Sequence, residues 1–168
     1  VGAGHVGKAV VHLARWLGFH VVASDDRAEF CNPQATSEAH AYHAVPMQDL
    51  PAAMNITPWT YIVLTTRGVN VDVPGLPALL GSEAAYIGVI GSRRRWLTTR
   101  KQLLENGISA ELLDRVHSPI GLELHAETPE EIAVSILAEI IMLRYRGDGQ
   151  MMSQPRPHKE VKLDSERP

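Results

Sequence analysis

The chain has few of the features that cross-link a protein or anchor it in a membrane. Cys31 is the single cysteine among 168 residues, which excludes an internal disulfide and fits a reducing compartment. No apolar run reaches the roughly 18 residues that a membrane span needs. Lys and Arg number 16 against 19 Asp and Glu, and this balance argues against a general nucleic-acid partner. We expect a cytoplasmic protein with no membrane partner and no nucleic-acid partner.

Motifs of nucleophilic and metal-dependent catalysis are also missing. The eight histidines show no H-x-x-x-H spacing, and neither a C-x-x-C pair nor a G-x-S-x-G elbow is present. Cys31 has no basic neighbour, so a bystander thiol is favoured over a reactive thiolate. His117 and Ser118 are adjacent, and adjacent side chains of an extended segment point apart. The sequence thus predicts a binding site more clearly than an active one, with no metal ligands.

A glycine-rich turn opens the chain. Gly2-Ala3-Gly4-His5-Val6-Gly7 reads G-x-G-x-x-G, the turn that joins the first strand of a Rossmann unit to a helix N-terminus and cradles a pyrophosphate. Only Val1 precedes it, so we expect the first strand to be truncated and the chain to be a piece of a longer protein. A helix over 5–17 and a strand over 21–23 should follow. The alternative is an ordinary helix start beside a solvated acidic loop.

The rest of the chain alternates between strand and helix patterns. Strands are expected over 41–45, 60–65 and 85–90, and helices near 47–54, over 75–80, 93–105 and 109–116, and from 128 to about 143. This order predicts an α/β fold: a Rossmann-like, doubly wound, mostly parallel sheet with helices on both faces in three layers. Residues 1–146 form the predicted domain, and 147–168 form a predicted disordered tail.

Ligands of an open α/β sheet bind beyond the carboxyl ends of its strands. Asp25 lies 23 positions after Gly2, at the tip where a carboxylate binds ribose hydroxyls. Arg27 could accept a 2′-phosphate or pair with the aspartates. Three consecutive arginines begin at Arg93, where they oppose the helix dipole unless an anion is bound. Glu131 could face the crevice, although a capping box with Thr128 is favoured.

The chain resembles the C-terminal Rossmann domain of the XdhC/CoxI family, the accessory proteins of xanthine dehydrogenase and related molybdenum hydroxylases. Three blocks carry this resemblance: the glycine turn, residues 24–30 with the sequence SDDRAEF, and residues 86–94 with the sequence YIGVIGSRR. The most specific block is HSPIGL at 117–122, followed by AETPEEIAVSI at 126–136. The similarity extends over about residues 1–146.

The resemblance implies a chaperone that binds the molybdenum cofactor (molybdopterin or its dinucleotide). It would protect the cofactor while a cysteine desulfurase installs the terminal sulfur, then insert it into a molybdenum hydroxylase client. A homodimer is plausible on the same ground. The residues expected to bind cofactor share positions at strand tips and flanking loops. They are Gly2, Gly4, His5, Val6, Gly7, Asp25, Asp26, Arg27, Thr66, Arg67, Gly91, Ser92, Arg93, Arg94, His117, Ser118 and Glu127.

Two departures and two alternatives accompany this interpretation. The family's Thr-Arg-Gly-His pattern is Thr66-Arg67-Gly68-Val69 here, and His125 stands where small or acidic residues are more common. The glycines and Asp25 would equally serve an NAD(P)-dependent oxidoreductase. A regulatory domain that senses a nucleotide is the second alternative. An accessory role is favoured over an enzyme.

Overall fold

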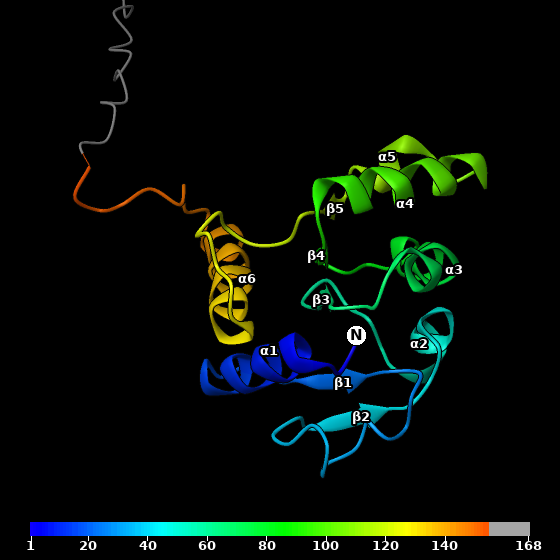
Figure 1. Cartoon of the computed structure of the whole chain (residues 1–168), viewed down its shortest axis with the longest axis horizontal. Helices are drawn as coiled ribbons and strands as arrows, with labels where there is room; N and C mark the ends of the chain where they lie inside the picture. Colours follow the sequence, from blue (N-terminus) through cyan, green and yellow to red (C-terminus); the bar gives the residue numbers. More distant parts are fainter. Residues whose placement is uncertain (155–168) are drawn as a thin grey trace, which may run out of the picture.

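The computed structural model describes residues 1–154, and its elements alternate along the chain as in a doubly wound fold (Figure 1). The strands are β1 (Val22–Ser24), β2 (Ala41–His43), β3 (Tyr61–Leu64), β4 (Tyr86–Val89) and β5 (Val116–His117). The helices are α1 (His5–Trp16), the 3-10 turn η1 (Met47–Asp49), α2 (Leu50–Ala53), α3 (Val69–Leu80), α4 (Arg93–Glu105), α5 (Ala110–Leu113) and α6 (Pro129–Tyr145). The predicted tail beyond residue 154 lies outside the described residues.

All strand pairs are parallel, and they form two sheets. β1 pairs with β2, and β3, β4 and β5 form a three-stranded sheet in that order. The first two residues of the chain lie between the two sheets, where Figure 1 marks the N-terminus. Gly2 N–H donates to Ser24 O at 2.7 Å, and Thr65 N–H donates to Val1 O at 2.8 Å. Val1 and Gly2 therefore join the two sheets at their carboxyl edge, in the central position of a Rossmann strand order.

Helices cover both faces because side chains of the strands alternate between them. Ile62 and Leu64 point into a core with α2, α3 and α4, and Tyr61 and Val63 point into a second core with α1 and α6. Successive strand residues face opposite sides, so this pattern is typical of a sheet buried on both faces. The predicted α/β class with a mostly parallel sheet is confirmed.

Several helix ends follow the sequence signals. Ser92 Oγ accepts from Arg95 N–H and Ser109 Oγ from Leu112 N–H, so both serines are N-caps. Thr128 and Glu131 form the complete capping box that was favoured for Glu131. The N-terminus of α6 thus has reciprocal side-chain caps.

Two element boundaries differ from the prediction. The helix expected over 75–80 begins at Val69 and contains Pro74 and Pro77, each of which lacks an amide donor. Burial of Leu76, Leu79 and Leu80 in the core stabilises this helix despite the prolines. The helix expected to end near residue 116 ends at Leu113, which leaves Val116 free to pair with β4. Among the described helices, none is long and apolar enough to cross a membrane.

Candidate ligand-binding site

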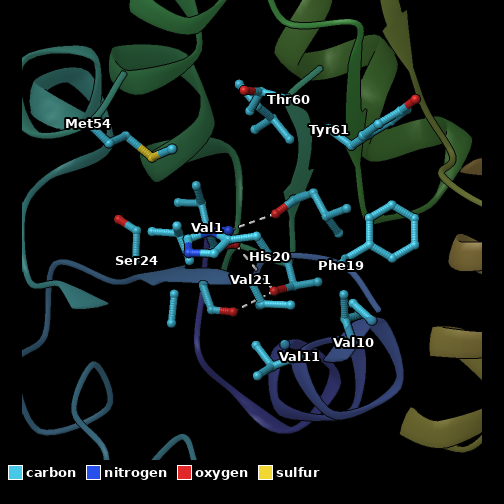
Figure 2. Close-up of a pocket in the computed structure, with 18 of the residues that line it drawn as sticks. Val1, Val10, Val11, Phe19, His20, Val21, Ser24, Met54, Thr60 and Tyr61 are labelled. Atoms are coloured by element: carbon cyan, nitrogen blue, oxygen red, sulfur yellow. Dashed lines mark hydrogen bonds between the residues drawn. The ribbon is translucent and has the colours of Figure 1, made fainter. Parts of the chain in front are cut away.

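One cavity lies inside the fold. It has a volume of about 490 Å³ and is lined mainly by apolar residues of α1, β1, β3 and α6. Figure 2 shows Val10 and Val11 of α1 on one side of it and Met54 on the other, with Val1 between. Residues of β1 and β3 lie on either side of it, and its mainly apolar lining does not suit a charged ligand.

The second cavity, of about 230 Å³, lies at the carboxyl ends of β1, β2 and β3. This is the edge where ligands bind in open α/β sheets. Its lining combines the glycine turn with polar strand tips and an apolar wall. The lining residues are Val1, Gly2, Gly4, Asp25, Asp26, Arg27, Val45, Pro46, Met47, Gln48, Thr65, Thr66, Arg67, Asn70, Val71 and Pro74.

The three glycines of the turn are required for different reasons. Gly2 has φ +95°, and a Cβ there would lie 2.6 Å from Thr65 O. A Cβ on Gly7 would overlap Gly2 O, so this glycine allows α1 to pack against the turn. Gly4 has an ordinary φ of −73°, and a Cβ there would meet nothing within 4 Å. The fold therefore requires Gly2 and Gly7, whereas Gly4 leaves open space on the cavity side.

Helix α1 begins at this turn without a side-chain cap. Gly4 is its N-cap, no side chain accepts from the first turn, and that turn contains no acidic residue. Within residues 1–154 no acceptor faces the amide groups of His5, Val6 and Gly7. Free amides and the positive end of the helix dipole favour a bound anion. The side chains add little here, because His5 is exposed and Val6 packs in the core with α6.

Asp25 is buried and accepts a hydrogen bond from the backbone of the glycine turn. It is 3 % exposed, and its carboxylate accepts from Ala3 N–H at 2.8 Å and from Arg27 Nε–H at 2.9 Å. Burial alone would raise the pKa of Asp25, but the hydrogen bonds from Arg27 and Ala3 outweigh it and hold this pKa well below its ordinary value. Arg27 also stacks on Phe30, with 3.9 Å from Cζ to the ring centroid. Arg27 thus pairs with an aspartate, one of the two roles foreseen for it.

Asp26 and Arg67 form an ion pair at the rim of the same cavity. Arg67 Nη2 lies 2.8 Å from both Asp26 oxygens, and both side chains are exposed. Asp26 follows β1 and Arg67 follows β3, so the pair bridges the strand tips on either side of the turn.

Arg95 is buried in a network that the sequence did not reveal. Its guanidinium contacts the fully buried Asp72 at 2.6 Å and Thr66 Oγ1 at 2.8 Å, and Thr66 also donates to Asp72. The third arginine of the run thereby fastens α4 to α3 and to the tip of β3. Arg93 and Arg94 are exposed, and neither forms an ion pair within the described residues. The only feature of the sequence that could have indicated this role of Asp72 is its position as a single acidic residue in a mostly apolar helix.

A second polar cluster joins β4, β5 and α6. The buried Glu139 accepts from Tyr86 Oη–H at 3.1 Å, lies 2.9 Å from His117 Nδ1, and accepts from Gly121 N–H. Burial would raise the pKa of Glu139, yet the hydrogen bonds of His117 and Gly121 lower it overall. Ser118 Oγ donates to Val89 O, so His117 and Ser118 have separate partners, as expected for adjacent residues. An acidic residue among the buried apolar positions of α6 could have predicted this cluster from the sequence, and it was not recognised.

The predicted site residues thus fall into three groups. The first group lines the 230 Å³ cavity: Gly2, Gly4, Asp25, Asp26, Arg27, Thr66 and Arg67. The second group lies outside it: Gly91, Ser92, Arg93 and Arg94 at the start of α4, His117 and Ser118 at β5, and the exposed Glu127 before α6. The third group, His5, Val6 and Gly7, forms the first turn of α1 next to Gly4 and does not line this cavity. Cys31 is buried, and burial raises the pKa of its thiol, which fits a bystander. Within the described residues no cluster of three or more potential metal ligands occurs.

The fold and this edge define a Rossmann-type α/β domain with a glycine turn that can accept an anion. Residues 1–140 match the family model described as the XdhC Rossmann domain. The chain belongs to the XdhC family. The resemblance found in the sequence is thereby confirmed.

Three named relatives are similar to the chain. The chain is 34 % identical to the "Uncharacterized protein YqeB" of Escherichia coli K12 over 92 % of its own length and 28 % of that protein. It is 31 % identical to a Bacillus subtilis protein named as a probable subunit of xanthine dehydrogenase, covering 86 % of this chain and 42 % of the relative. It is also 26 % identical to the "Molybdenum cofactor insertion chaperone PaoD" of Escherichia coli K12, covering 66 % and 35 %.

A solved structure described as a xanthine dehydrogenase from Bacillus halodurans has the same fold. It superposes with a TM-score of 0.74 at 32 % identity, covering 86 % of this chain and 43 % of that chain. The chain therefore spans less than half the length of each of these relatives.

Proposed function

We propose that this protein is an accessory protein of molybdenum hydroxylases. Its Rossmann domain binds the phosphate end of the molybdenum cofactor, which is protected while a cysteine desulfurase supplies the terminal sulfur. The cofactor is then inserted into xanthine dehydrogenase or a related client. This proposal is supported by membership of the XdhC family and by two relatives, one named as a molybdenum cofactor insertion chaperone and one named for xanthine dehydrogenase.

The open space at Gly4 is the observation that carries the proposal. Gly2 and Gly7 are explained by close backbone contacts, but no protein atom requires a glycine at position 4. A phosphate needs close approach to the backbone at this point, and the unpartnered amides of His5 and Val6 can donate to it. The residues present therefore fit a phosphorylated cofactor.

The predicted residues at the start of α4, at β5 and before α6 are assigned to the remainder of the cofactor. Arg95 holds the start of α4 beside Thr66, with 3.2 Å from Nη1 to Thr66 O, so the exposed Arg93 and Arg94 begin next to the tip of β3. Guanidinium groups there favour an anion. When bound, the cofactor would supply redox chemistry to the client, and the residues of this chain would hold and shield it. His117, Ser118 and Glu127 belong to this proposed half of the site.

Replacement of Gly4 by aspartate separates binding from folding. Gly4→Asp places a carboxylate in the anion's space, so affinity for molybdenum cofactor should fall at least about 100-fold, because a like charge replaces free amide donors. Aspartate is also a better N-cap than glycine and complements the helix dipole, so the melting temperature should hold or rise slightly. Anaerobic calorimetry with purified cofactor, together with thermal denaturation, measures both effects.

Gly81→Asp is the matched control. Gly81 also has an ordinary φ and open space around its Cβ position, but it caps the far end of the 12-residue helix α3. This variant should bind cofactor as the parent does, and parallel titrations with NAD⁺ and NADP⁺ test the oxidoreductase alternative. Unchanged cofactor affinity in Gly4→Asp would remove the turn from the site, and tight nicotinamide binding without cofactor binding would contradict the proposal.

A further inference from the structure

Asp25 has no capacity left for a ligand. Its Oδ1 accepts from the amide and Nε of Arg27 at 3.0 and 2.9 Å, and its Oδ2 accepts from Ala3 N–H at 2.8 Å and Arg27 Nη2 at 3.0 Å. A carboxylate offers about four lone-pair positions, and these four donors occupy them. The carboxylate at the expected ribose position is therefore used to hold the glycine turn.

Asp26, the next residue, has the capacity that Asp25 lacks. It lines the same cavity, and its side chain is 43 % exposed. A single nitrogen of Arg67, Nη2, lies 2.8 Å from both of its oxygens, and Arg27 Nε lies 4.0 Å from Oδ1. An exposed ion pair contributes little to stability, because water screens both charges. A ligand can therefore form hydrogen bonds with the Asp26 carboxylate without disturbing the fold, and Arg67 lines the same cavity as Gly4.

Part of the cavity lining is apolar and can pack against a planar ring. Val45, Met47, Val71 and Pro74 supply apolar surface, and Gln48 adds an amide. The volume of about 230 Å³ is below the roughly 300–1,000 Å³ that encloses a complete drug-sized ligand. The cavity thus combines three features: an anion site at Gly4, the exposed carboxylate of Asp26, and an apolar wall. Its volume fits part of a larger ligand.

We infer that Asp26, rather than Asp25, accepts the vicinal hydroxyls of a ribose, and that this cavity takes the nucleoside end of a dinucleotide ligand. This inference rests on the proposed function, because it requires a phosphate at the Gly4 turn. It also narrows that function. A pterin monophosphate brings no ribose to Asp26, so the dinucleotide form of the cofactor is the ligand that fills the cavity.

Paired ribonucleotides and deoxyribonucleotides test the role of Asp26. ADP, GDP and CDP, each with its 2′-deoxy counterpart, are titrated by calorimetry into the 168-residue chain. At least one ribonucleoside diphosphate should bind about 10- to 100-fold more tightly than its deoxy form, as expected for a hydrogen bond to a charged group. In Asp26→Ala this ratio should fall to within about threefold. The ratio of the two affinities is compared, rather than either affinity alone, because the substitution also frees Arg67 from its ion pair. That change affects the ribonucleotide and the deoxyribonucleotide equally.

Glu83→Ala removes the same charge from an exposed position outside the cavity and should leave the ratio unchanged. An Asp26→Ala ratio equal to the parent's overturns the inference, and so does a failure of all three ribonucleoside diphosphates to bind. If Gly4→Asp abolishes cofactor binding in either case, the proposed function stands without this inference. If Gly4→Asp changes nothing, the proposed function itself fails.

Discussion

Glu139 is a carboxylate on the buried face of α6, and its hydrogen bonds explain how a charge is tolerated there. Tyr86 from β4, His117 from β5 and the amide of Gly121 all contact it. The Tyr86 and His117 rings also pack together, with centroids 4.7 Å apart. Glu139 therefore fixes the loop that follows β5, which carries part of the proposed site, against both the sheet and α6.

Replacement of Glu139 by glutamine should destabilise the protein by about 2 kcal/mol at neutral pH, because an amide donor would replace an acceptor of charge-assisted hydrogen bonds. The pKa of Glu139 is lowered in the folded state from an ordinary value of 4.5. Its contribution to stability is thus complete above about pH 4.5 and is lost as the pH falls through the lower folded-state pKa. Urea unfolding between pH 7 and pH 3 should show a shallower decline for Glu139→Gln than for the parent.

Tyr86→Phe provides the graded comparison for this carboxylate. It removes one donor to Glu139 and leaves those of His117 and Gly121, so the loss should be about 1 kcal/mol. A loss in Tyr86→Phe as large as that in Glu139→Gln would mean that the bond from the tyrosine hydroxyl, rather than those from His117 and Gly121, accounts for the contribution of this carboxylate.

The roles of the two adjacent aspartates show where sequence reasoning stops at the residue scale. The spacing from the glycine turn predicts an acid at the tip of β1, and Asp25 and Asp26 are both there. Which of them is saturated depends on Ala3 N–H and the reach of the Arg27 side chain, and no spacing encodes those contacts.

Arg95 connects three elements, and its loss should loosen helix α4. Arg95→Met would leave the carboxylate of Asp72, which is fully buried, without its cation, at a cost of about 3–5 kcal/mol. Arg94→Met removes the same charge one residue earlier on the exposed surface and should change stability by less than about 0.5 kcal/mol. Chemical denaturation of both variants measures the difference. Equal, small effects would show that the Asp72 network does not hold α4.

Element type was easier to predict than element length. The strands over 60–65 and 85–90 and the helix over 93–105 were predicted because apolar runs and capping residues are local signals. The start of α3 was predicted six residues late, because Pro74 and Pro77 disfavour a helix locally and only the tertiary core around Leu76 and Leu79 compensates. Helix propensity depends on neighbouring residues in the sequence, whereas burial of these leucines depends on contacts between distant elements.

On the scale of the whole molecule, the first two residues connect the two sheets. Val1 N donates to Val63 O at 2.7 Å, Val1 O accepts from Thr65, and Gly2 N–H donates to Ser24 O. These bonds alternate between β3 and β1, as they do for the end of a parallel strand with a neighbour on each side. The slot of about 490 Å³ continues from this point between the same two strands.

An apolar extension ahead of Val1 should therefore join the two sheets into one. Four added residues with the sequence Val-Ile-Val-Ile, apolar on both faces as a central parallel strand requires, should enter the slot. Burial at about 1.5–3 kcal/mol per side chain exceeds the ordering cost of about 1–2 kcal/mol per residue, so a gain of about 2–4 kcal/mol is expected. Hydrogen exchange at the amides of Val22, Ser24, Tyr61 and Val63 should slow at the same time. A Val-Pro-Val-Pro extension keeps the chain apolar but removes two ladder donors, so it should recover little of this gain. Equal stabilisation by both extensions would mean that the slot accepts apolar groups without strand pairing, and the two halves would then be held together by α1 and α6 rather than by a continuous sheet.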